Sequence, residues 1–220
     1  MRKICAAVMV LALLAAPVAW AQKYQEGVHY FNIDHPDTTP RDYVEVTEVF
    51  SYLCTHCKDF EPYIDHWLPK QPADVHFSRI PVEFGRATWG LYARAYVAAS
   101  VLGIENKSHV AMMDAIWKDH KQMRTMDQLA DWYSQFGVDK DRFMATAQSF
   151  AVDMRLRREQ QEAKDYGVNG TPTMIVDRKY RVSAGGAVSD FDTMLDVVDF
   201  LVAKDLAELK ARKPETSPSK

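Results

Sequence analysis

One stretch of the sequence decides the fold, and it reads Glu48-Val49-Phe50-Ser51-Tyr52-Leu53-Cys54-Thr55-His56-Cys57. The residues that lead into it, 44–50, are rich in β-branched and aromatic side chains, which predicts a strand that ends at the first cysteine. Beyond Cys57, the apolar residues Phe60, Ile64 and Trp67 recur at helical spacing. The cysteine pair is therefore expected where a strand passes into a helix.

The rest of the chain predicts an α/β sheet into which helices are inserted. We expect strands at residues 28–33, 44–50, 75–84, 173–176 and 180–183, several helices within 86–166, and a final amphipathic helix from about residue 190. Pro81 should bend the far end of the third strand, because proline cannot donate to a sheet. Thr125 and Gln128 form a capping box for one helix of the inserted block, and Gly137 should end that helix.

The first 21 residues have the pattern of a secretory signal peptide. Arg2 and Lys3 precede the uncharged run 4–18, and the small-residue site Ala19-Trp20-Ala21 comes just before Gln22. We expect cleavage after residue 21 and export to the periplasm, the alternative being an uncleaved N-terminal anchor. At the other end, residues 212–220 are rich in Lys, Pro and Ser, which predicts a disordered tail.

The expected mature chain is divided at the helical block. Its sheet is built from two parts, 22–85 and 167–211, and the helical insertion comprises residues 86–166. The 47% hydrophobic content is enough for a substantial core, and we expect a monomer. The net charge of −3 comes from mixed signs without a basic stripe, which argues against nucleic acid as a partner.

Cysteine usage points to redox chemistry. Cys5 would leave with the signal peptide, so the mature chain keeps only Cys54 and Cys57. Exported proteins use disulfides as staples, but this pair closes so small a ring that it would contribute only about 2 kcal/mol by loop entropy. Stabilisation is therefore a poor reason for the pair to exist.

A CxxC motif at the start of a helix supplies the groups that disulfide exchange needs. Cys54 would lie at the helix N-terminus, where free backbone N–H groups and the helix dipole favour a thiolate. His56 could add a donor or a cation beside that thiolate, and Cys57, one turn inside, would be the resolving thiol. A stabilised thiolate means a stabilised reduced state, so the disulfide form should act as an oxidant.

Two other interpretations of the motif are a zinc half-site and an inert structural pair. Zinc takes four ligands, but the mature chain has no second cysteine pair and no His-x₃₋₅-His pair stands out. We therefore expect no metal and no cofactor.

Glu48 is predicted to be a buried carboxylate. Alternation along its strand places it on the face of Val44, Val46 and Phe50, where burial would raise its pKa. A carboxyl group held there could relay the proton of the resolving thiol. Arg79, on the neighbouring strand, is its natural counter-charge, the alternative being that both residues are solvated at a sheet edge.

These motifs resemble the DsbA family of bacterial disulfide oxidoreductases over nearly all of the mature chain. The resemblance rests on residues 48–57, on the loop Gly167-Val168-Asn169-Gly170-Thr171-Pro172-Thr173, and on the long helical block between them. It implies a thioredoxin-like fold with an inserted all-helical subdomain. It also implies that Pro172 is cis and faces the cysteines, that the backbone of Thr171 binds an extended substrate, and that Glu48 and Arg79 match the family's buried acid and its basic partner.

The resemblance further implies that the chain oxidises reduced, unfolded exported proteins through a mixed disulfide. A quinone-linked membrane partner of the DsbB type would then reoxidise it. Two positions depart from the family pattern, because Thr55 stands where proline is frequent and Thr171 where valine is frequent. Both residues should tune the redox potential, and Thr171 leaves a reductase or isomerase open. The alternative from another class is a thioredoxin-like chaperone module in which redox chemistry is incidental.

Overall fold

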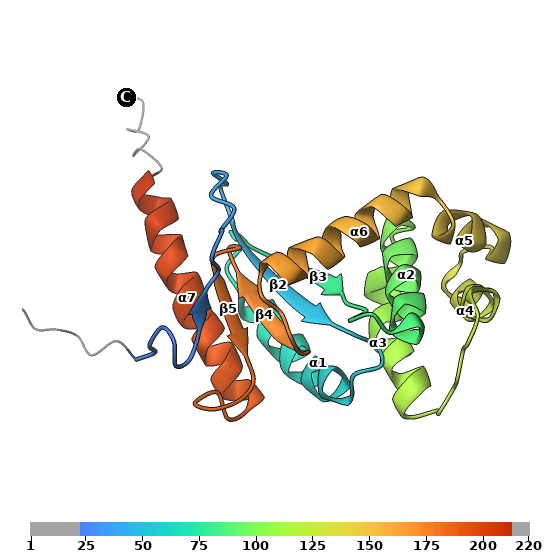
Figure 1. The fold of residues 1–220 in the computed structure, drawn as a ribbon, viewed down its shortest axis with the longest axis horizontal. Coiled ribbons are helices and arrows are strands. Elements are labelled where there is room, and N and C mark those ends of the chain that lie inside the picture. Colours follow the sequence, from blue (N-terminus) through green and yellow to red (C-terminus); the bar gives the residue numbers. More distant parts are fainter. Residues whose placement is uncertain (1–22, 213–220) are drawn as a thin grey trace, which may run out of the picture.

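The computed structural model describes residues 23–212 and shows a mixed sheet with helices on both faces and a helical block at one end (Figure 1). The strands are β1 (Phe31–Asn32), β2 (Val44–Phe50), β3 (Val75–Pro81), β4 (Thr173–Val176) and β5 (Tyr180–Ser183). The α-helices are α1 (Thr55–Trp67), α2 (Ala87–Val101), α3 (Glu105–Trp117), α4 (Met126–Tyr133), α5 (Lys140–Ala147), α6 (Phe150–Asp165) and α7 (Phe191–Arg212). Short 3-10 turns follow α1 (Leu68–Lys70) and α4 (Ser134–Phe136).

The sheet has the strand order β1-β5-β4-β2-β3, in which only β2 and β3 are parallel. Strand β2 lies between β3 and β4, and six of its seven residues are buried. A strand covered on both faces needs a nearly continuous apolar run, which is what residues 44–50 supply. Apolar and polar residues therefore do not alternate strictly along β2, because both faces of the strand are covered. The carboxylate of Glu48 lies in the interior as a result.

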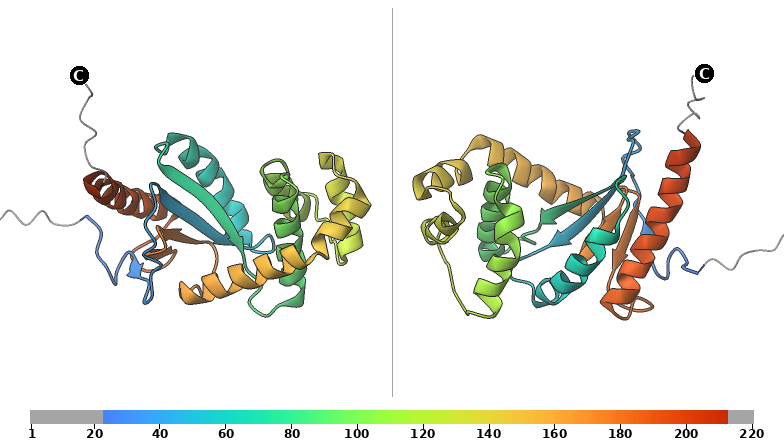
Figure 2. Two further views of the ribbon diagram at one scale, coloured as in Figure 1. Left: turned by 90° about the horizontal axis from the view of Figure 1, so that it is seen from above. Right: turned by 180° about the vertical axis from the view of Figure 1, so that it is seen from behind.

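The sheet is the middle of three layers. Helices α1 and α7 cover one face and α6 covers the other, as the view from above shows (Figure 2). Phe60 of α1 and Val198 of α7 pack with Val46 on the first face. On the second face, Ala163 of α6 packs with Val49 and Ile175. These layers are the α/β arrangement that the sequence predicts.

The helical block α2 to α5, with the first part of α6, has a core of its own, and the end of β2 reaches into it. Phe50, Tyr52 and Cys57 belong to the same buried cluster as Tyr96 of α2 and Met112 of α3. The predicted helical insertion is therefore present as α2 to α6, between Ala87 and Asp165. Its core continues directly into the cysteine motif.

Several predicted boundaries are wrong at strand ends. The first strand is only Phe31–Asn32, because residues 25–29 form a turn in which the N–H of His29 donates to the carbonyl of Gln25. The third strand stops at Pro81 and does not reach Phe84, whose φ of 46° turns the chain toward α2. The other three strands have the predicted bounds.

At the helix ends, the predicted cap at Thr125 and the predicted stop at Gly137 are present, and one predicted boundary differs. The N–H of Gln128 donates to the Thr125 hydroxyl at 3.2 Å, and Gly137 ends the following turn with a φ of 85°. Arg212 was predicted as the start of the tail but is the last residue of α7. The predicted signal peptide (1–21) and the rest of the predicted tail (213–220) lie outside the described residues. Within 23–212, no helix combines the length and apolarity that a bilayer crossing requires.

Candidate active site

The cysteine pair lies at the start of α1, directly after the central strand. Phe50 ends β2, and a short turn follows in which the N–H of Cys54 donates to the carbonyl of Ser51 at 3.1 Å. Cys54 is the N-cap residue of α1, so its side chain lies beside the free N–H groups of the first turn. Both cysteines are free thiols; Cys54 is half-buried and Cys57 is fully buried.

The environment of Cys54 favours its thiolate. A side-chain hydrogen bond from Cys57 is the largest cause that lowers the pKa of Cys54, to about 5. A side-chain hydrogen bond with Thr171 and the backbone N–H groups of Cys57 and His56 act in the same direction, while partial burial opposes them. At neutral pH the reduced protein therefore carries an anionic, accessible sulfur.

The environment of Cys57 has the opposite effect. Burial raises its pKa far above the ordinary thiol value, and the hydrogen bond to Cys54 and the charge of Glu48 raise it further. The two sulfurs of one motif thus differ in protonation, Cys54 as thiolate and Cys57 as thiol. Disulfide exchange uses this asymmetry, because the sulfur with the lower pKa is the better leaving group.

The loop before β4 meets the cysteine motif. The Thr171–Pro172 peptide bond is cis, as the family resemblance implies, and Pro172 is buried. Cys54 Sγ lies 3.3 Å from the carbonyl oxygen of Thr171, to which the thiol form donates. A carbonyl oxygen can only accept, so this contact belongs to the protonated sulfur. The loop is thus placed to contact whatever is attached to Cys54.

Glu48 and Arg79 form the ion pair that the sequence predicts. The two residues are directly opposite in the parallel register of β2 and β3, and Arg79 Nε donates to Glu48 Oε2 at 2.8 Å. Glu48 is completely buried, and the side chain of Arg79 is 14% exposed. Burial raises the pKa of Glu48, and the guanidinium charge only partly offsets this effect. Neither residue is solvated at a sheet edge.

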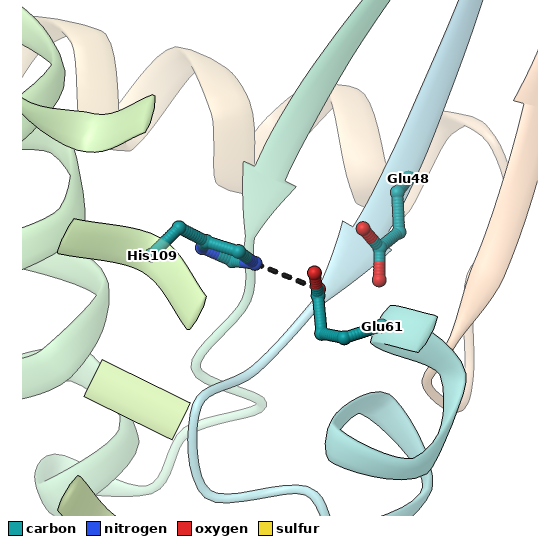
Figure 3. A group of neighbouring side chains, drawn as sticks. All are labelled: Glu48, Glu61 and His109. Atoms are coloured by element: carbon teal, nitrogen blue, oxygen red, sulfur yellow. Dashed lines mark hydrogen bonds and ion pairs between the residues drawn. The ribbon is translucent and has the colours of Figure 1, made fainter. Parts of the chain in front are cut away.

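Two further buried residues complete this cluster, and the sequence analysis missed both. Arg79 Nη2 donates to Glu61 Oε2 at 3.2 Å, and Glu61 Oε1 lies 2.8 Å from Nε2 of His109 on α3 (Figure 3). The other ring nitrogen of His109 lies 3.2 Å from the Tyr52 hydroxyl. A signal for Glu61 did exist, since it lies four residues after Cys57 on the buried face of α1. His109 gave none.

Glu48, Glu61 and His109 could each offer a metal ligand, and the three ligand atoms lie within 4.8 Å of one another. Arg79, however, donates hydrogen bonds to both carboxylates. A divalent cation at this point would meet the guanidinium charge, so this donor set does not fit a metal. The expectation that the chain needs no metal and no cofactor stays a prediction.

Thr55 and His56 lie on the open side of the motif, and both are exposed. The contribution of His56 to the Cys54 thiolate in this structure is its backbone N–H. The predicted roles of its imidazole ring and of Thr55 in tuning the redox potential stay predictions.

Comparison with known proteins gives one consistent family. Residues 45–199 match the model of the DSBA-like thioredoxin domain. A protein of Pseudomonas aeruginosa named thiol:disulfide interchange protein DsbA is 36% identical over 208 residues, which covers 94% of this chain and 98% of that protein. The protein of the same name from Pseudomonas syringae pv. tomato is 37% identical, covering 96% of this chain and 98% of the relative.

Solved structures agree with the sequence relatives. The crystal structure of Pseudomonas aeruginosa DsbA superposes with a TM-score of 0.79 at 37% identity, covering 86% of this chain and 98% of that one. The oxidoreductase DsbA from Xylella fastidiosa gives a TM-score of 0.75 at 35% identity, with 81% and 96% covered. The likeness thus spans both the sheet and the helical block.

Proposed function

The chain belongs to the DSBA-like thioredoxin domain family and is a thiol:disulfide oxidoreductase, and we propose that Cys54 and Cys57 are its redox-active pair. The observation that carries this proposal is the difference between the two sulfurs, one half-buried with its pKa lowered to about 5 and the other fully buried. Disulfide exchange needs an accessible sulfur that is a good leaving group and a protected sulfur beside it.

The reaction starts from the disulfide form. A thiolate of the substrate attacks Cys54 Sγ, the Cys54–Cys57 bond breaks, and Cys57 leaves with the electron pair. A mixed disulfide now joins the substrate to Cys54. The second thiolate of the substrate attacks its own bonded sulfur, a substrate disulfide forms, and Cys54 leaves as a thiolate. Two electrons have passed from the substrate to the cysteine pair.

Glu48 supplies a proton in the first half of this reaction. Cys57 leaves as an anion inside the protein, where burial makes a thiolate unfavourable. Glu48 is also buried, and its raised pKa means that it holds a proton more readily than an ordinary carboxyl group. A proton passed from Glu48 toward Cys57 leaves a carboxylate that Arg79 stabilises through its 2.8 Å hydrogen bond. Glu48 is therefore the proton relay, and Arg79 holds it in place.

Substrate binds along the loop of Thr171 and Pro172. The Thr171 carbonyl lies 3.3 Å from Cys54 Sγ, so a substrate bonded to that sulfur lies beside this backbone. Pairing between backbones is independent of side chains, which suits reduced, unfolded proteins of many sequences. The predicted signal peptide, which would be cleaved, supports export of the chain and a reaction in the periplasm. Reoxidation of the dithiol is assigned to a membrane partner of the DsbB type, on the family relationship alone.

The direction of electron flow follows from the same thiolate. A stabilised thiolate stabilises the reduced protein, which makes the disulfide a stronger oxidant. Equilibration with glutathione buffers measures this property. We expect a reduction potential well above the value of about −270 mV of thioredoxin and toward the value of about −120 mV of strong oxidants of this kind. A potential near that of thioredoxin would favour the reductase or isomerase alternative.

A chaperone module is the alternative from another class. It requires binding of unfolded chains to survive when exchange is abolished. Cys54→Ser separates the two, because disulfide formation in a reduced model substrate should disappear completely. Undiminished promotion of folding by this variant would support the chaperone alternative.

A further inference from the structure

A cavity adjoins the cysteine motif on its helical side. Leu53, the residue before Cys54, lines this space of about 310 Å³, which we name the Leu53 cavity. Its apolar wall consists of Leu53, Tyr92, Ile116, Trp117 and Met123. A volume of this size is at the lower limit of ligand pockets, which suits one side chain better than a large ligand.

The cavity is held in shape by hydrogen bonds from the segment that follows α3. The N–H of Lys121 donates to the carbonyl of Ala115 at 2.8 Å, and the N–H of Met123 to the Tyr92 hydroxyl at 3.2 Å. On the side of the cysteines, Nε1 of Trp117 donates to the carbonyl of Tyr52 at 2.9 Å. The wall is therefore fixed to both the helical block and the turn that carries Cys54.

The rim of the cavity is basic. Lys121, Arg124 and His120 line it and are exposed, and none of its lining residues is a carboxylate. Of the two cations Lys121 and Arg124, Lys121 forms an ion pair with Asp119, whose carboxylate lies 3.8 Å from Lys121 Nζ. Both side chains of that pair are more than half exposed, so the pairing is weak and leaves Lys121 available. An apolar wall under a cationic rim fits an apolar side chain with an acidic neighbour.

We propose that the Leu53 cavity is a side-chain subsite for polypeptide substrates, which takes an aliphatic or aromatic residue flanked by Asp or Glu. This inference rests on the proposed function, in which the substrate cysteine is bonded to Cys54. Neighbouring Cα atoms are about 3.8 Å apart, and an extended chain advances about 3.3 Å per residue. A residue one to three positions from the substrate cysteine can therefore reach a cavity that begins at Leu53.

Three dithiol peptides test the subsite. In these peptides the two residues that follow the first cysteine are Phe-Glu, Phe-Gln or Ala-Glu, and the rest of the sequence is constant. The measured quantity is the second-order rate constant for reduction of the oxidised full-length protein. We expect Phe-Glu to react fastest. In the double variant Lys121→Glu with Arg124→Glu, its rate should fall by about tenfold, as charge complementarity acts mainly on association, and Phe-Gln should change by less than about twofold.

A matched control reverses two cations elsewhere. Arg142→Glu with Arg157→Glu makes the same change in net charge on exposed residues of α5 and α6. This control should slow Phe-Glu and Phe-Gln equally and by less than about twofold. Two outcomes would contradict the claim that the basic rim recognises an acidic residue. One is an equal fall in the Phe-Glu rate constant in the control and the test variant, and the other is equal rate constants for Phe-Glu and Phe-Gln in the unmodified protein.

The apolar wall is tested by filling the cavity. Thr88 is an exposed lining residue near the start of α2, and Thr88→Trp should abolish the preference for Phe-Glu over Ala-Glu. A preference that persists in this variant contradicts the proposal. The proposed function is tested separately by Cys54→Ser, which should stop the reaction of all three peptides. Residual exchange in that variant would refute the role of Cys54, whereas peptide selectivity concerns the subsite alone.

Discussion

Glu48 and Arg79 stand directly opposite each other in the parallel pair β2 and β3, and Arg79 also donates to Glu61 on α1. One guanidinium therefore joins two carboxylates that come from different elements. Of these two carboxylates, Glu48 is the one whose charge contributes to the raised pKa of Cys57, whereas Glu61 is not among its causes. The two acids share a cation but differ in their access to the resolving sulfur, which makes each a control for the other.

The first prediction uses this difference. Glu48→Gln keeps the shape of the side chain but removes its titrating proton, so reduction of the disulfide should slow by roughly 10²-fold, as for loss of a general acid. Stopped-flow rates between pH 4 and pH 8 would measure it. Glu61→Gln should retain most of the rate and its pH profile. Equal slowing in both variants would show that the cluster acts only through its structure.

The second prediction concerns the stability of the reduced protein against pH. The pKa of Cys54 is lowered to about 5, below the value of about 8.5 of an unfolded thiol. Between these values the unfolded chain binds more protons at this site, so the contribution of Cys54 to stability grows with pH and is lost as pH falls through about 5. Urea unfolding of the reduced protein and of Cys54→Ser should give curves that diverge from pH 5 to pH 8. Parallel curves would contradict the lowered pKa.

The third prediction concerns Thr171. Its side-chain hydrogen bond is one of the causes that lower the pKa of Cys54, so Thr171→Val should raise that pKa and make the disulfide a weaker oxidant. Ultraviolet absorbance of the thiolate during a pH titration measures the change. Thr171→Ser keeps the hydroxyl group, so it is the matched control and should leave the pKa of Cys54 nearly unchanged. A pKa that stays the same or falls in Thr171→Val would mean that the Thr171 hydroxyl does not act on the sulfur.

The fourth prediction concerns His109, which is 2% exposed and contacts Glu61 and Tyr52 through its two ring nitrogens. His109→Phe leaves both partners without this hydrogen bond, which should cost about 1–3 kcal/mol for each buried group at pH 7. Burial holds the pKa of His109 well below that of a free imidazole. As pH falls below about 6.5, the unfolded chain therefore binds a proton at this site that the folded protein does not bind, and the unmodified protein loses stability. The variant should therefore lose less stability than the unmodified protein between pH 6.5 and pH 5. Denaturant unfolding at both pH values measures the difference, and a larger loss in the variant would contradict the neutral histidine.

The sequence predicted what is encoded locally. The bounds of β2 follow from its β-branched run, and the pairing of Glu48 with Arg79 follows from alternation on two neighbouring strands. Strand ends were harder to predict, since β1 is limited by the turn at residues 25–29 and β3 ends before Phe84, whose φ of 46° turns the chain. The cis bond before Pro172 came from resemblance alone.

The contact between His109 and Glu61 could not be predicted in the same way. The two residues are 48 positions apart, and they meet only because α3 packs against α1. Nothing in the periodicity of either helix gives the angle at which the two helices cross. The cysteine motif and its place at the start of a helix could be recognised from the sequence itself, but its buried partners on the helical side depend on how α3 packs against α1.

Cys57 is part of the buried cluster that also holds Tyr52, Tyr96 and Met112, so the helical block keeps water from this sulfur. The properties of the four-residue motif consequently depend on the helical block around it. Grafted onto a bare sheet without α2 to α6, the same four residues would have a hydrated second sulfur, and the contrast between the two thiols would fade. A smaller scaffold that is designed to carry this motif should therefore also include a buried apolar environment for the second cysteine.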